Sequence, residues 1–92
     1  MKNLIELHVD RIEINGEKHL IIKIPYDKDL IKVIKKIKGI RWNRKNKYWH
    51  TKESLKKIDL IFQYFNGMVL IKTGDPFLKK RFHIQSQFGK LT

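Results

Sequence analysis

The chain has 92 residues, which is enough for one small domain with a modest hydrophobic core. It contains no cysteine, which excludes disulfide bonds and thiolate metal sites. Its formal net charge of +12 favours an anionic partner, and we expect neither a signal peptide nor a transmembrane helix because no apolar stretch is long enough.

The first segment is predicted to form a β-hairpin. Apolar residues alternate from Ile5 to Val9 and then shift by one position, which indicates a β-bulge near Asp10 and Arg11. Asn15-Gly16 is a favoured two-residue hairpin turn, and the second strand is expected to end at Pro25. The predicted core face of the hairpin comprises Ile5, Leu7, Val9, Ile12, Ile14, Leu20, Ile22 and Ile24.

A helix is predicted next, with Asp27 as its N-cap and Gly39 as its C-terminal stop. Four apolar residues follow at helical spacing and should face the core: Leu30, Val33, Ile34 and Ile37. Most of the remaining surface of this helix is basic: Lys28, Lys32, Lys35, Lys36 and Lys38. Repulsion among these cations would be relieved by an anionic partner.

Residues 40–50 are predicted to form a second hairpin around a polar turn. If the loop has four residues, Trp42 faces Trp49 on one side of the sheet, and Arg41 lies on the opposite side. Thr51 is expected to cap a second helix that ends at Asn66-Gly67. The core stripe of that helix would be Leu55, Ile58, Phe62 and Phe65.

The predicted fold class is α+β, with a small antiparallel sheet in ββαββα order and two helices packed on one face. Residues 68–72 form a candidate short strand, and residues 1–73 would make up the domain. Residues 74–92 are a basic and aromatic segment, interpreted as a short helix or tail. Its phenylalanines, Phe77, Phe82 and Phe88, would dock the segment or contact a further domain or subunit.

Positive charge is concentrated in residues 28–52, which carry ten Lys or Arg residues against one acid, Asp29. A basic block with interleaved aromatics is typical of a surface that binds a phosphate backbone. We therefore predict a nucleic-acid-binding domain in a cytoplasmic, nucleoid-associated protein, with DNA favoured over RNA. The candidate binding residues are Lys28, Lys32, Lys35, Lys36, Arg41, Trp42, Arg44, Lys45, Lys47 and Tyr48.

The predicted binding mode is electrostatic. If about six cations neutralise phosphates of duplex DNA, log affinity falls against log salt with a slope of about −5. Arg41 and Arg44 are candidates for base-edge contacts because a guanidinium pairs bidentately with guanine. Trp49 is expected in the core, whereas Trp42 is left open between the core and a stacking role.

The sequence contains no constellation that supports catalysis. The histidines, His8, His19, His50 and His83, show no ligand spacing, so we expect no metal site and no cofactor. His8 and Arg11 spell H-x-x-R, which we attribute to chance. We find no Ser-His-Asp set, phosphate-binding glycine loop or paired carboxylates, and we expect no enzymatic activity.

Residues 24–65 resemble a segment of two DNA-handling families. One is the N-terminal region of bacterial tyrosine recombinases (phage-type integrases), with Gly39, Arg41, Trp42 and Trp49 matching its pattern. The other is the HARP domain of annealing helicases, which has a similar order of helix and aromatic hairpin. Both resemblances imply a DNA-associated accessory domain. The catalytic domain of a recombinase, with its Arg, His and Tyr residues, has no counterpart in this sequence, so we expect a recombinase fragment or a freestanding binding domain.

Four other functions are kept as alternatives, of which a small enzyme is the least favoured. An RNA-binding module would show the same charge and aromatics. A protein-interaction domain would use the apolar C-terminal segment. A binder of anionic membranes is disfavoured because the basic helix has no Trp or Phe anchor on its apolar face.

Overall fold

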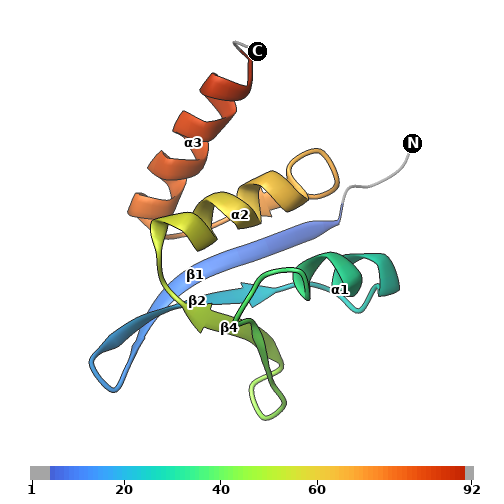
Figure 1. Ribbon diagram of the computed structural model, residues 1–92, viewed down its shortest axis with the longest axis vertical. Coiled ribbons are helices and arrows are strands. Elements are labelled where there is room, and N and C mark those ends of the chain that lie inside the picture. Colours follow the sequence, from blue (N-terminus) through green and yellow to red (C-terminus); the bar gives the residue numbers. More distant parts are fainter. Residues whose placement is uncertain (1–4, 91–92) are drawn as a thin grey trace.

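The computed structural model describes the backbone of residues 5–90 and the side chains of residues 5–84. The fold is α+β, as predicted, with a five-stranded sheet and helices packed against it (Figure 1). In chain order the elements are β1 (Glu6–Ile14), β2 (Glu17–Lys23), α1 (Lys28–Ile34), β3 (Arg41–Asn43), β4 (Tyr48–Lys52), α2 (Leu55–Phe65), β5 (Leu70–Lys72) and α3 (Pro76–Lys90).

The strands lie in the order β3-β4-β2-β1-β5. The first four are antiparallel neighbours, and β5 pairs in parallel with β1 through Glu6↔Leu70, Leu7↔Ile71 and His8↔Lys72. A parallel pair needs a long crossover connection, and α2 lies within the segment that returns the chain to β1. The basic β3–β4 hairpin is therefore at one edge of the sheet and β5 at the other.

The β1–β2 hairpin turns at Asn15 and Gly16, whose φ angles of 51° and 81° confirm the predicted turn. Pairing between the strands is continuous from His8↔Lys23 to Ile14↔Glu17, so the predicted bulge near Asp10 and Arg11 is wrong. Continuous pairing preserves the alternation of side chains. Arg11 consequently continues the core face, and Ile12, which is 38% exposed, points to the other face.

Helix α1 begins as predicted. The Oδ1 atom of Asp27 accepts hydrogen bonds from the backbone amides of Asp29 (3.0 Å) and Leu30 (3.1 Å). The helix ends at Ile34, earlier than its apolar stripe indicates. Tighter turns follow, in which the Ile37 amide donates to the Ile34 carbonyl (3.1 Å). These turns keep Ile37 buried, so it belongs to the hydrophobic core although it lies beyond the end of the α-helix.

The predicted cap of the second helix is wrong. Ser54, and not Thr51, caps α2, because its Oγ accepts from the Lys57 amide at 3.1 Å. Thr51 instead lies in β4 opposite Leu20, where it is buried. Pairing of β4 with β2 keeps the chain extended as far as Lys52 and so delays the helix. The predicted end of this helix at Asn66-Gly67 is confirmed, with φ +90° at Gly67.

One hydrophobic core joins the sheet to the helices. It comprises Leu7, Val9, Leu20, Ile22, Leu30, Ile34, Ile37, Ile58, Ile61, Phe65, Val69, Leu78 and Phe82. Because strand residues of one parity and residues of all three helices belong to this cluster, the helices lie on the same side of the sheet (Figure 1). The opposite face carries exposed polar side chains, among them His8, Lys23 and Lys72.

The C-terminal segment is held on α2. Leu78 and Phe82 of α3 are buried, and the rings of Phe62 and Phe82 stack with centroids 5.8 Å apart. The guanidinium of Arg81 donates two hydrogen bonds to the carboxylate of Asp59, at 3.0 and 2.8 Å. Phe88 lies outside the residues whose side chains are described, so its expected docking role stays a prediction.

Candidate nucleic-acid interface

The β3–β4 hairpin presents different side chains on its two faces. Trp42 pairs with Trp49 across a loop of four residues, which confirms the register predicted for that loop length. Trp49 also pairs with Ile22 of the core, so both tryptophans lie on the helix side of the sheet. Arg41 pairs with His50 and lies on the opposite face.

The hairpin turn is closed by Asn43. Its carbonyl accepts from the Lys47 amide (2.7 Å), and its Oδ1 accepts from the Asn46 amide (2.9 Å). Lys47 adopts a φ of +58°, a left-handed conformation that strains a residue with a Cβ. The turn thereby holds a compact group of exposed cations, Arg44, Lys45 and Lys47, at the edge of the molecule.

A groove lies between α1 and the helix-facing side of this hairpin. Its volume is about 580 Å³. Residues of the segment after β2, of α1 with its C-cap and of both hairpin strands line it: Ile24, Pro25, Tyr26, Ile31, Lys35, Trp42 and Trp49. The two tryptophan rings form one aromatic wall, with centroids 5.2 Å apart and planes tilted by 54°.

The aromatic residues of the groove differ in their burial. Trp49 packs against the core, as predicted. Trp42, left open by the sequence, is 48% exposed, and Tyr26 is 83% exposed. Tyr26 is absent from the predicted binding residues. The signal that could have found it is a large aromatic between Pro25 and the helix cap Asp27, outside any apolar stripe.

The candidate cations belong to two regions next to this groove, the α1 segment and the β3–β4 hairpin. On α1, Lys28 and Lys32 are one helical turn apart on the side that continues to Lys35 in the groove. The turn cations occupy the tip of the other wall. Lys36 is exposed beyond the end of the helix. Of the candidate cations, Lys35 is the one that lines the groove together with Trp42.

Two predicted binding residues are directed elsewhere. Arg41 and Tyr48 lie on the sheet face opposite the tryptophans, together with His50. The rings of Tyr48 and His50 meet edge to face with centroids 6.1 Å apart. Burial, and then the neighbouring His19 and Arg41, lower the pKa of His50 below its ordinary value of 6.5. The lowered pKa disfavours the protonated, charged form of His50 on this face.

The cations between Lys28 and Lys47 have no acidic partner among the residues whose side chains are described. All nine of them are exposed. The ion pairs in that part of the chain involve other cations, such as Lys52 with Glu17 at 3.3 Å. The positive charge of the nine exposed cations between Lys28 and Lys47 is therefore available to an external anion.

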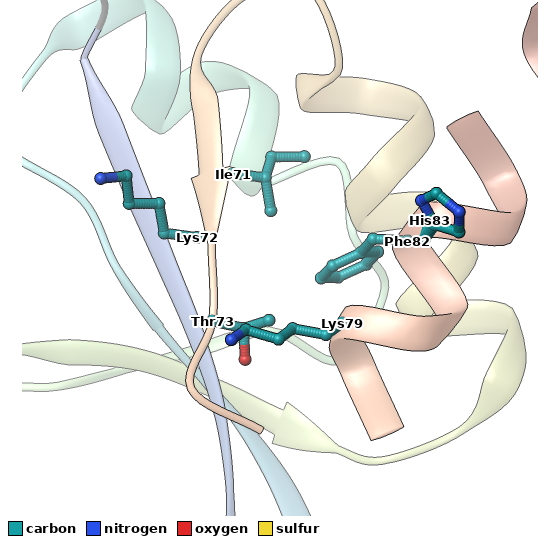
Figure 2. A pocket seen from close by; sticks show the side chains of 6 residues that line it. All are labelled: Ile71, Lys72, Thr73, Lys79, Phe82 and His83. Carbon is teal, nitrogen blue, oxygen red and sulfur yellow. The ribbon is translucent and has the colours of Figure 1, made fainter. Parts of the chain in front are cut away.

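A second hollow of about 520 Å³ lies between β5 and α3 (Figure 2). Ile71 and Phe82 line it, and Thr73 and Lys79 point toward each other at its rim. Lys72 points away from it, and its Nζ is 3.0 Å from a carboxylate oxygen of Glu6. Phe82 in the lining of this hollow is 8% exposed, whereas Trp42 in the first groove is 48% exposed. The groove beside Trp42 is the stronger candidate site.

Comparison of the chain with protein-family models, with curated proteins and with solved structures finds no match. None of the described helices combines the length and the apolar character that crossing a bilayer requires.

Proposed function

We propose that this chain is a DNA-binding domain that holds the phosphate backbone between α1 and the β3–β4 hairpin turn. The observation that carries the proposal is the set of nine exposed cations between Lys28 and Lys47, none of which forms an ion pair with a side chain in the described part of the chain. Neutralising phosphates with such cations releases counterions and drives association.

The two groups of cations would have complementary roles. Lys28, Lys32 and Lys36 would meet phosphates along the helix, and the turn cations would meet them at the hairpin tip. These contacts fix the position of the protein on the nucleic acid and carry no sequence information. Arg44 in the turn and Arg41 are proposed as readers of base edges. Because Arg41 lies on the other sheet face, each arginine has to be tested separately.

The resemblance to recombinase N-terminal regions and to HARP domains supports DNA as the partner and an accessory role as the function. It involves Gly39, whose φ of +86° is the left-handed conformation that favours glycine. A Cβ at this position would also lie 3.1 Å from Nζ of Lys57. Gly39 is therefore favoured by the backbone conformation at this position, whereas Arg41 and Trp42 are the residues of the pattern that are available to a ligand.

The test compares triple variants that remove equal charge from different surfaces. The helix variant carries Lys28→Gln, Lys32→Gln and Lys36→Gln, and the turn variant carries Arg44→Gln, Lys45→Gln and Lys47→Gln. Affinity for duplex DNA is measured by fluorescence anisotropy between about 50 and 200 mM salt. We expect a wild-type slope of about −5, reduced in magnitude by about 2 to 3 in each variant.

The matched control removes three exposed cations from α2 and α3, as Lys56→Gln, Lys79→Gln and Lys80→Gln. It has the same net charge as the other triple variants and should keep nearly the wild-type slope. If the control loses as much affinity as the helix and turn variants, binding reflects net charge alone and the proposed interface is wrong. Tighter binding to RNA than to duplex DNA at equal salt would favour the RNA-binding alternative.

A further inference from the structure

The groove beside α1 exposes more aromatic surface than the fold requires. Tyr26 is 83% exposed and Trp42 is 48% exposed, although the hydrophobic core begins next to them at Trp49. Exposed apolar surface that is gathered in a hollow marks a binding site more often than isolated exposed residues do. One cation, Lys35 at the C-cap of α1, also lines the groove.

These features restrict the chemistry of an occupant. A flat ring fits an aromatic wall because stacked or tilted rings attract each other beyond the contribution of area. No carboxylate belongs to the lining, and the one charged lining residue is Lys35, so a cationic ligand would be repelled. An uncharged apolar peptide would gain nothing from the lysines. A planar group attached to an anionic chain satisfies both the tryptophans and the cations.

We propose that this groove takes an unpaired nucleobase of single-stranded DNA, stacked against Trp42 and Tyr26, with a phosphate of the same strand at Lys35. This inference rests on the proposed function, because it states which form of DNA the same surface prefers. In a duplex the base faces are stacked on one another inside the helix, so only an unpaired base presents a free face to the groove.

The intrinsic tryptophan fluorescence of the chain can report this contact. Its two tryptophans are Trp42 and Trp49, and both line the groove. Stacking of a base on this wall should quench the intrinsic tryptophan fluorescence. The ligands to compare are a short oligothymidylate, an abasic phosphodeoxyribose strand of equal length and a duplex of equal charge. We expect the oligothymidylate to quench and to bind about tenfold more tightly than the abasic strand.

Two groove variants and one control test the residues. Tyr26→Leu keeps an apolar side chain at a highly exposed position, so it should fold normally, and Trp42→Leu removes the ring from the wall. Each should lower affinity for the oligothymidylate by about tenfold while changing affinity for the abasic strand and the duplex little. Phe77→Leu, at an aromatic on α3 that is 42% exposed, should change none of the three affinities.

The outcomes separate this inference from the proposed function. If the oligothymidylate and the abasic strand bind equally and neither quenches, the groove does not take a base, whereas salt-dependent duplex binding would leave the proposed function standing. Equal losses for all three ligands in Tyr26→Leu would also overturn the inference. If no DNA binds at moderate salt, the proposed function itself fails, and the inference fails with it.

Discussion

The α3 side of the molecule and the side formed by α1 and the β3–β4 hairpin differ in whether their arginines are paired with acidic side chains. On the α3 side, Arg81 is bound through two hydrogen bonds to Asp59. Arg11 contacts Glu53 and Asp75, and its guanidinium lies 4.7 Å from the ring centroid of Phe77. On the other side, nine cations have no acidic partner among the described side chains.

This contrast distinguishes cations whose charge is paired within the fold from exposed cations that have no acidic partner among the described side chains. Arg11 is only 18% exposed in its side chain and joins three segments that are far apart in sequence. Its charge is used within the protein. The exposed lysines of α1 repel one another and contribute no such connection. Substitutions on the first side should therefore affect stability, and substitutions on the second should affect binding.

The largest expected effect is that of Phe82→Ala. This side chain is 8% exposed and stacks on Phe62, so its removal leaves a cavity between α2 and α3. We expect the free energy of unfolding, measured by urea denaturation, to fall by about 3 kcal/mol. Met68→Ala, at a residue that is 45% exposed, is the control and should change it by less than about 0.5 kcal/mol. Equal values for the two variants would mean that α3 is not part of the cooperative unit.

Arg11→Met should have the next largest effect. The variant keeps much of the side-chain volume but leaves the carboxylates of Glu53 and Asp75 partly buried without their cation. We expect a loss of about 2 kcal/mol in the free energy of unfolding, with no change in the salt slope of DNA binding. Arg44→Met removes the same charge from the hairpin turn and should show the reverse pattern. If both arginines affect stability alike, the distinction between the two sides is lost.

Lys47→Gly should have a smaller effect of opposite sign on stability. Glycine adopts the observed φ of +58° without steric strain, so we expect the free energy of unfolding to rise by about 0.5 to 1 kcal/mol. Affinity for DNA should nevertheless fall, because one turn cation is removed. Lys45→Gly makes the same change of charge at a position outside the positive-φ residues and should lower stability. A stability gain in both variants would exclude strain at Lys47 as the cause.

The smallest expected effect is the response of stability to pH at His50. Its folded pKa is lowered below 6.5, so the unfolded chain binds the proton more readily than the folded protein does. Stability is therefore complete above about pH 6.5 and decreases as the pH falls through the folded pKa. His50→Gln should reduce the decline of the free energy of unfolding between about pH 7 and pH 5. Parallel pH profiles for the variant and the wild-type protein would contradict this assignment.

Local features of the fold were predictable from short stretches of sequence. The Asn15-Gly16 turn, the Asp27 cap, the pairing of Trp42 with Trp49 and the helix end at Asn66-Gly67 each depend on dihedral or hydrogen-bonding preferences of a few neighbouring residues. The candidate cations were predictable for a similar reason, because charge density is a property of the chain itself.

Features that depend on distant segments were decided by the tertiary structure. Thr51 has a residue type suited to a helix cap, but pairing of β4 with β2 holds it in a strand. No bulge forms at Arg11. Its side chain on the core face is instead paired with Glu53 and Asp75, which come near it only in the folded chain. The groove likewise assembles Tyr26, Lys35 and Trp42 from three separate segments. The sequence by itself determined the turns, the caps and the charge, since these act over a few residues. Burial and strand pairing, which act between segments far apart in the chain, decided which side chains meet.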